Sequence, residues 1–220
     1  AGRGRSPLPL GVSRSESKDG SLALHAAIFA MAQAQAEIEE AAQPERSGQL
    51  PAHVEARLQE LQAAVRRERE EVRRLLGSRP TATKARDRFG RLPLHVAAEE
   101  RAGPEVVRWL LEVYPSGARQ ADKHEELPLH DAVRERAEPG VVRLLLEAYP
   151  TGARSRGRMG LLPLHLAVDD ANADHEVVQL LLDAYPRGAR ERDDPEAGGE
   201  LPLHIAAREG AGAPVLRALL

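Results

Sequence analysis

Apolar positions recur along the second half of the chain in two alternating patterns. The phrase Leu-Pro-Leu-His, followed by small apolar residues, begins at Leu92, Leu127, Leu162 and Leu201. A second pattern, Val-Val-x-x-Leu-Leu, begins at Val106, Val141 and Val177. Apolar residues at i, i+1, i+4 and i+5 form a broad stripe on a helix. Both patterns therefore predict short helices that bury one face.

Proline and glycine mark the ends of these predicted helices. Proline fits the first helical turn, where its missing N–H would have no acceptor. The first helices are therefore expected to begin at Pro93, Pro128, Pro163 and Pro202. A Tyr-Pro pair stops the second helices, because the residue before proline avoids helical geometry. The Gly-Ala that follows predicts a turn into an extended link.

The spacing of the phrase predicts the architecture. Successive copies are 35, 35 and 39 residues apart. A period of this size is typical of stacked two-helix modules, which form an all-α solenoid. The expected repeats are residues 81–115, 116–150 and 151–186, with an incomplete repeat at 187–220.

These phrases resemble the ankyrin repeat, whose motif is Thr-Pro-Leu-His-x-Ala in a period of about 33. The resemblance covers residues 81–220 well and residues 20–80 loosely. Leucine replaces threonine at the first position of every copy, which removes a hydroxyl that would cap the helix. The inserted Tyr-Pro lengthens the period by about two residues. The resemblance implies a helical stack that binds other proteins.

The first 80 residues depart from the regular pattern. Residues 1–20 are polar, lack periodicity and are predicted to be a disordered lead-in. Residues 21–80 allow two interpretations: a long antiparallel helical hairpin, or two degenerate repeats with the second beginning at Leu50. Seams of apolar residues favour the hairpin. They comprise Leu24, Ile28, Met31, Ile38 and Ala42, then Leu58, Leu61, Val65, Val72 and Leu75.

Composition narrows the class of protein. The chain has 220 residues, of which 42% are hydrophobic and 30% charged, and its net charge is −3. The signs interleave, which predicts no nucleic-acid partner. No apolar run is long enough to predict membrane insertion. Cysteine is absent, which excludes disulfides and thiolate chemistry. An intracellular, cytoplasmic location is expected, with an organelle-targeting leader as the alternative.

Histidine recurs at one position of the repeat, in His25, His95, His130, His165 and His204. A zinc ion needs imidazole nitrogens about 2.0–2.1 Å away. Neighbouring packed helices lie about 8–10 Å apart, so equivalent histidines cannot share an ion. We therefore expect each histidine to bond backbone groups of the adjoining link, and we expect no metal and no cofactor.

No pattern of an active site emerges. The sequence has no phosphate-binding Gly-rich loop followed by Lys-Ser/Thr and no Gly-x-Ser-x-Gly elbow. The paired carboxylates Asp169-Asp170 and Asp193-Asp194 point to different sides of any helix and are expected to be solvated. The protein is therefore predicted not to be an enzyme.

Residues that vary between repeats are the candidates for partner binding. Links and first helices of such a stack line its concave side, so residues flanking the phrase should contact a partner. They are Arg91, Glu126, Leu161 and Glu200 before it, and Glu99, Glu100, Arg134, Glu135, Asp169, Asp170, Arg208 and Glu209 after it. Most are acidic, which favours a protein partner with basic patches.

Two other functions remain as alternatives to an interaction scaffold. The chain is a structural subunit of a larger assembly if the N-terminal hairpin is a docking arm with an apolar outer strip. It is the regulatory repeat region of an enzyme if a kinase or ligase domain lies elsewhere. The chain stops at Leu220, inside a predicted second helix and without a polar capping repeat, so further residues are expected beyond it.

Overall fold

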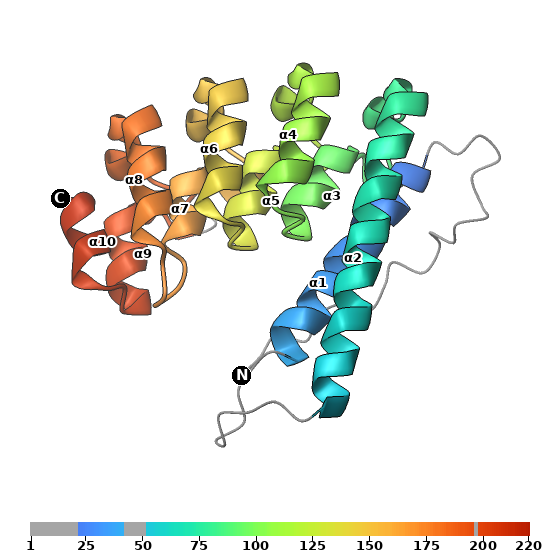
Figure 1. The fold of residues 1–220 in the computed structure, drawn as a ribbon. Coiled ribbons are helices and arrows are strands. Elements are labelled where there is room, and N and C mark those ends of the chain that lie inside the picture. Colours follow the sequence, from blue (N-terminus) through green and yellow to red (C-terminus); the bar gives the residue numbers. More distant parts are fainter. Residues whose placement is uncertain (1–21, 42–51, 196–197) are drawn as a thin grey trace.

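Helices are stacked side by side along the molecule (Figure 1). The computed structural model describes residues 22–41, 52–195 and 198–220. All regular elements in these ranges are helices, and the expected all-α solenoid is confirmed. The predicted lead-in at 1–20 lies outside the described residues.

Two long helices form the N-terminal end of the stack. Helix α1 (Ala23–Ala41) and helix α2 (Ala52–Ser78) run antiparallel and pack along each other (Figure 1). A 3-10 helix, η1 (Pro80–Lys84), follows them. Leu24, Ile28 and Val72 of the predicted seams are fully buried there. The described part of residues 21–80 thus holds one helix pair, and we propose residues 21–80 as one unit.

Each following repeat contains an inner helix, an outer helix and a 3-10 turn. The inner helices are α3 (Pro93–Glu99), α5 (Pro128–Arg134), α7 (Pro163–Ala167) and α9 (Pro202–Glu209). The outer helices are α4 (Pro104–Val113), α6 (Pro139–Ala148), α8 (His175–Ala184) and α10 (Ala213–Ala218). Every inner helix begins at the predicted proline. We keep the repeat boundaries that the sequence suggested as a proposal: residues 81–115, 116–150, 151–186 and 187–220.

The turn predicted after each Tyr-Pro is a 3-10 helix. The 3-10 helices η2 (Pro115–Arg119), η3 (Pro150–Arg154) and η5 (Pro186–Arg190) contain the Gly-Ala at which the turn was expected. Proline ends the outer helix but also starts a new turn, because its fixed φ suits both helix types. In η2 the N–H of Gly117 donates to the carbonyl of Tyr114 over 2.9 Å. The chain becomes extended only after the arginine.

The core runs the length of the stack between the two rows of helices. Inner helices contact inner helices of the neighbouring repeats, and outer helices contact outer ones. Ala97, Ala132 and Ala206 are fully buried on the inner row, where their small side chains let helices approach closely. Val107, Val142 and Val178 are equally buried on the outer row. Each repeat thus buries its apolar surface on its neighbours.

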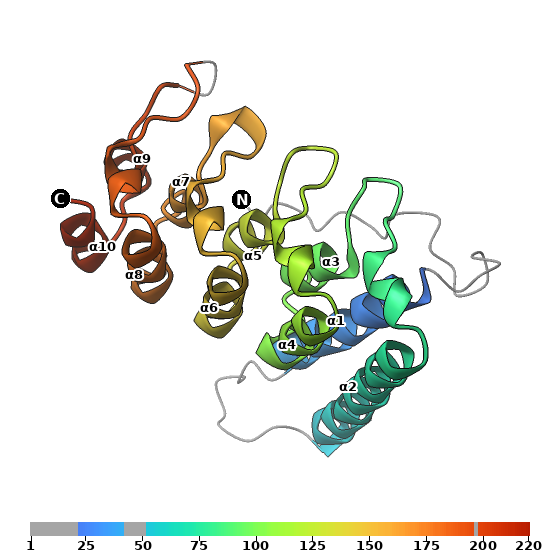
Figure 2. The same ribbon diagram turned by 90° about the horizontal axis from the view of Figure 1, so that it is seen from above.

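Four link loops connect each 3-10 turn to the next inner helix. They comprise residues 85–91, 120–126, 155–161 and, with a two-residue gap in the description, 191–200. Figure 2 shows all four projecting to the same side, beside the row of inner helices. We call the surface formed by the link loops and inner helices the inner face.

The third repeat has a modified inner helix. Helix α7 ends at Ala167, because one extra residue separates His165 from the Val-Val pattern of α8. The other repeats leave the inner helix through a left-handed residue, at Arg101, Arg136 and Gly210. The third repeat instead turns at Asp170, whose Oδ1 accepts the N–H of Asn172 over 2.7 Å.

Candidate functional site

The repeated histidine of the inner helices α3, α5 and α7 connects two repeats. Its Nδ1 accepts the N–H of the phrase's first leucine, as His130 does from Leu127 over 3.0 Å. Its Nε2 contacts a backbone carbonyl of the next link loop, as His130 contacts that of Ser155 over 3.0 Å. His95 and His165 bond Glu126 and Glu191 in the same way. The expected structural role is confirmed for these three histidines, whereas the bond that the structure describes for the side chain of His204 is with the N–H of Leu201 in its own repeat.

The two hydrogen bonds fix the protonation state of each ring. Because Nδ1 accepts, the proton lies on Nε2, which donates to the carbonyl. Burial lowers the pKa of His95 to about 4 and also lowers the pKa of His130 and His165. These rings are therefore neutral at neutral pH. In the part of the chain that the structure describes, no three His, Asp or Glu side chains are placed to hold a metal ion.

The candidate residues flanking the phrase form ion pairs with one another. The residue before the phrase pairs with the one eight positions later, in Arg91–Glu99, Glu126–Arg134 and Glu200–Arg208. The order of charges is reversed in the first pair. Each pair joins a link loop to the inner helix that follows it. The residues at these positions vary between repeats, but the ion pair within the repeat is kept. The sequence predicted only a partner-binding role for these residues.

The third repeat breaks this pattern. The residue before its Leu-Pro-Leu-His phrase is Leu161, which is partly exposed. Leucine is uncharged and cannot form an ion pair with Asp169. Asp169 instead lies 3.8 Å from Arg208 of the next repeat. Asp170 pairs with Arg136 of the preceding repeat. Ion pairs between repeats thus replace the internal pair where α7 is short.

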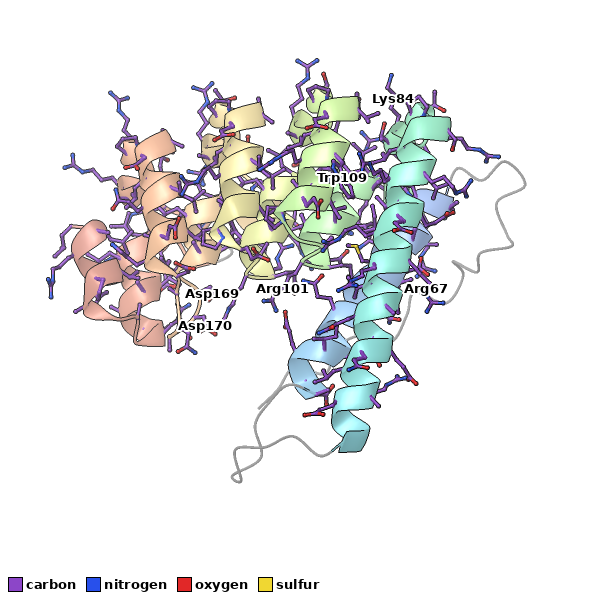
Figure 3. All side chains as sticks on the ribbon, in the orientation of Figure 1. Arg67, Lys84, Arg101, Trp109, Asp169 and Asp170 are labelled. Carbon is purple, nitrogen blue, oxygen red and sulfur yellow. The ribbon has the colours of Figure 1, made fainter. Side chains whose placement is uncertain are left out.

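A groove of about 670 Å³ lies where the inner helices α5 and α7 end. Ala132, Ala167 and Val177 supply apolar lining. Its charged residues are Arg134, Glu135, Arg136, Asp169, Asp170, Asp174 and Glu209, so acids exceed bases. Asp169 and Asp170 lie on the lower side of the stack in the view of Figure 3. Five of the twelve candidate residues thus line one cavity.

The remaining candidates differ in exposure. Glu135 is the C-cap residue that follows α5; it is exposed and has no ion pair among the described residues. Glu100 is the C-cap residue that follows α3, and it is half-buried. Partner binding by the twelve candidate residues stays a prediction. The expectation that the pair Asp193-Asp194 is solvated is wrong for Asp193, which is buried and whose Oδ1 accepts the N–H of Glu200 over 2.6 Å. Asp194 is exposed, as expected.

Sequence analysis missed one carboxylate on the inner face. Asp131 of α5 is buried, with only 7% of its surface exposed. The other repeats place Val96, Leu166 and Ile205 at this position. A comparison of the repeats would have revealed a lone acid in an apolar position.

A comparison with protein families settles the class. The family model for ankyrin repeats (3 copies) matches residues 61–154 and 129–220, which together exceed half of the chain. The chain is an ankyrin repeat protein. A search of curated proteins found no match. The matched range begins at residue 61, inside α2.

Membership of the family carries a general function. Ankyrin repeats are protein–protein interaction modules and are typically not catalytic. In this ankyrin repeat protein, none of the helices in the described ranges combines the length and apolar composition needed to cross a bilayer.

Proposed function

We propose that this ankyrin repeat protein is an interaction scaffold that binds a partner protein on its inner face, the side predicted to be concave. The observation that carries the proposal is the groove at the ends of α5 and α7, where an apolar floor meets an excess of carboxylates. Such a surface suits a partner segment that combines apolar and basic side chains.

Exposure on the N-terminal helices favours this proposal over a docking arm. Residues 55–78 of α2 expose no large hydrophobic side chain. Arg66, Arg67 and Glu70 are exposed on this helix instead. A docking arm would need an apolar strip on its outer side. The scaffold therefore remains the preferred function.

Reversing one charge on the inner face tests the proposal. Glu135→Arg in the 220-residue chain is expected to lower recovery of the bound partner about tenfold, which corresponds to about 1.4 kcal/mol. Glu135 lines the groove and has no described ion pair to lose. Recovery is measured by quantitative mass spectrometry after affinity capture from cells that naturally contain the protein.

The matched control lies on the outer side of the same repeat. Glu147 of α6 is also exposed and also acidic. Glu147→Arg is expected to leave recovery unchanged, because the net charge changes equally but the inner face is intact. Equal losses from the two variants would contradict the assignment of the inner face.

A further inference from the structure

The side chain of Asp131 occupies a position that is apolar in the other repeats. Burial of its carboxylate there lowers the stability of the fold. An ionised carboxylate taken out of water needs pairing and hydrogen bonds to compensate for lost hydration. The other repeats have apolar residues at this position, which need no ion pair and no hydrogen bond: Val96, Leu166 and Ile205. Residues that break a local rule in this way are expected at functional sites.

The hydrogen bonds of Asp131 are incomplete. Its Oδ1 lies 3.4 Å from Nη1 of Arg134, a long contact. Its Oδ2 is buried and has no hydrogen-bond partner among the described residues. The guanidinium of Arg134 is shared, because it also pairs with Glu126. One carboxylate oxygen thus lacks the donor that burial demands.

The surrounding charges leave negative charge in excess. Arg91 pairs with Asp87 and Glu99, and Arg134 pairs with Glu126 and Asp131. We call these six residues the Asp131 cluster. It contains four carboxylates and two guanidiniums, so full ionisation leaves two uncompensated negative charges. Each arginine is already divided between two acids.

The pKa shifts of two acids in the cluster agree with this excess of negative charge. Burial raises the pKa of Asp131 well above its usual range, and the negative charge of Glu99 raises it further. Burial also raises the pKa of Glu99, although Arg91 opposes the shift. An added cation would lower the pKa of both groups.

The cluster opens to solvent on the inner face. The side chains of Arg134 and Glu99 are 36% and 38% exposed, so they separate Asp131 from water only partly. Rotation of the Asp131 carboxyl group exchanges its two oxygens, so the oxygen without a donor can turn toward an incoming group while Arg134 stays in place. The route that we infer for a cationic group from outside runs past the side chains of Arg134 and Glu99, between α3 and α5.

We propose that the Asp131 cluster is the subsite for one arginine or lysine side chain of the partner protein. The incoming cation supplies the missing donor to Asp131 and neutralises part of the excess negative charge. This subsite rests on the proposed scaffold function and names the chemistry that the partner must present there. Its binding energy offsets the instability that Asp131 imposes on the free protein.

Titration with N-acetylarginine amide tests the subsite without any partner protein. The carboxyl carbon signals of Asp131 and Glu99 are followed by NMR in the intact 220-residue chain, with N-acetylcitrulline amide at equal ionic strength as the neutral control. We expect a saturable shift with the arginine probe and none with citrulline. The same shift with both probes, or an unmoved Asp131 signal, would overturn the proposal.

Two variants separate the subsite from general attraction. Asp131→Leu restores the residue type of the other repeats and should fold, and it is expected to weaken the probe's effect on Glu99 about tenfold. Glu147→Gln on the outer side should change nothing. Undiminished binding to Asp131→Leu would overturn the subsite. A negative result with the arginine probe rejects the subsite only. The scaffold function is tested separately by the Glu135→Arg variant, so failure of the subsite and failure of the scaffold function are distinguishable.

Discussion

Replacing His130 with leucine is expected to lower the free energy of unfolding by about 2–4 kcal/mol. The ring joins the N–H of Leu127 to the carbonyl of Ser155 in the next link loop, over 3.0 Å on each side. Neither backbone group has another hydrogen bond in the described residues. Leucine preserves apolar volume but leaves both groups unpaired, one of them inside the stack.

The last repeated histidine provides the matched control. The side chain of His204 accepts the N–H of Leu201 over 3.3 Å, yet it is exposed and forms no hydrogen bond to a further link loop in the described part of the chain. His204→Leu is therefore expected to cost about 1 kcal/mol or less. Urea unfolding at neutral pH, followed by circular dichroism and by Trp109 fluorescence, measures both changes. Equal losses would contradict the role of the histidine as a connection between repeats.

Acidification from about pH 7 to about pH 4.5 is expected to destabilise the fold strongly. Burial lowers the pKa of His25, His95, His130 and His165 in the folded state. The unfolded imidazoles protonate near the ordinary value of 6.5, so the unfolded state binds more protons below it. Stability is thus fully present above about pH 6.5 and is lost as the pH falls through the folded pKa values.

The pKa of His95 sets the size of this effect. A fall from 6.5 to about 4 corresponds to on the order of 3 kcal/mol for this side chain alone. The other three histidines act in the same direction. Asp131 acts in the opposite direction, because its raised pKa makes protonation favour the folded state as the pH falls.

The urea midpoint across this pH window measures the loss. Replacing the exposed His124 and His175 with glutamine is expected to leave the profile unchanged, because neither ring is buried. A midpoint that stays constant from about pH 7 to about pH 4.5 would show that the repeated histidines are not held neutral by the fold.

The sequence predicted much of the fold because its signals are local. Proline at Pro93, Pro128, Pro163 and Pro202 begins each inner helix as expected, since the first turn accepts a residue without an N–H. The turn after each Tyr-Pro was predicted, but its 3-10 geometry was not, because a proline that ends one helix can begin another. The shortened α7 follows from a single extra residue, whose place in the turn depends on contacts across repeats.

The candidate site was harder to predict, because its contacts are not local in sequence. Glu126 and Arg134 are eight residues apart, and only the fold of link loop onto helix makes them a pair. Variation between repeats therefore proposed candidate contact residues but did not reveal that several of them pair with one another. Asp131 differs from its counterparts in the other repeats, yet the cost of that difference is visible only once the position is known to be buried.

Photo-crosslinking from two exposed positions tests the central claim, that a partner occupies the inner face. Met159 lies in the third link loop and is 52% exposed, whereas Val113 ends the outer helix α4 and is 37% exposed. Each is replaced in turn with benzoylphenylalanine, and the intact chain is irradiated in its native cells. We predict a crosslinked partner from position 159 and none from position 113. Adducts from position 113 alone, or equally from both, would contradict the account.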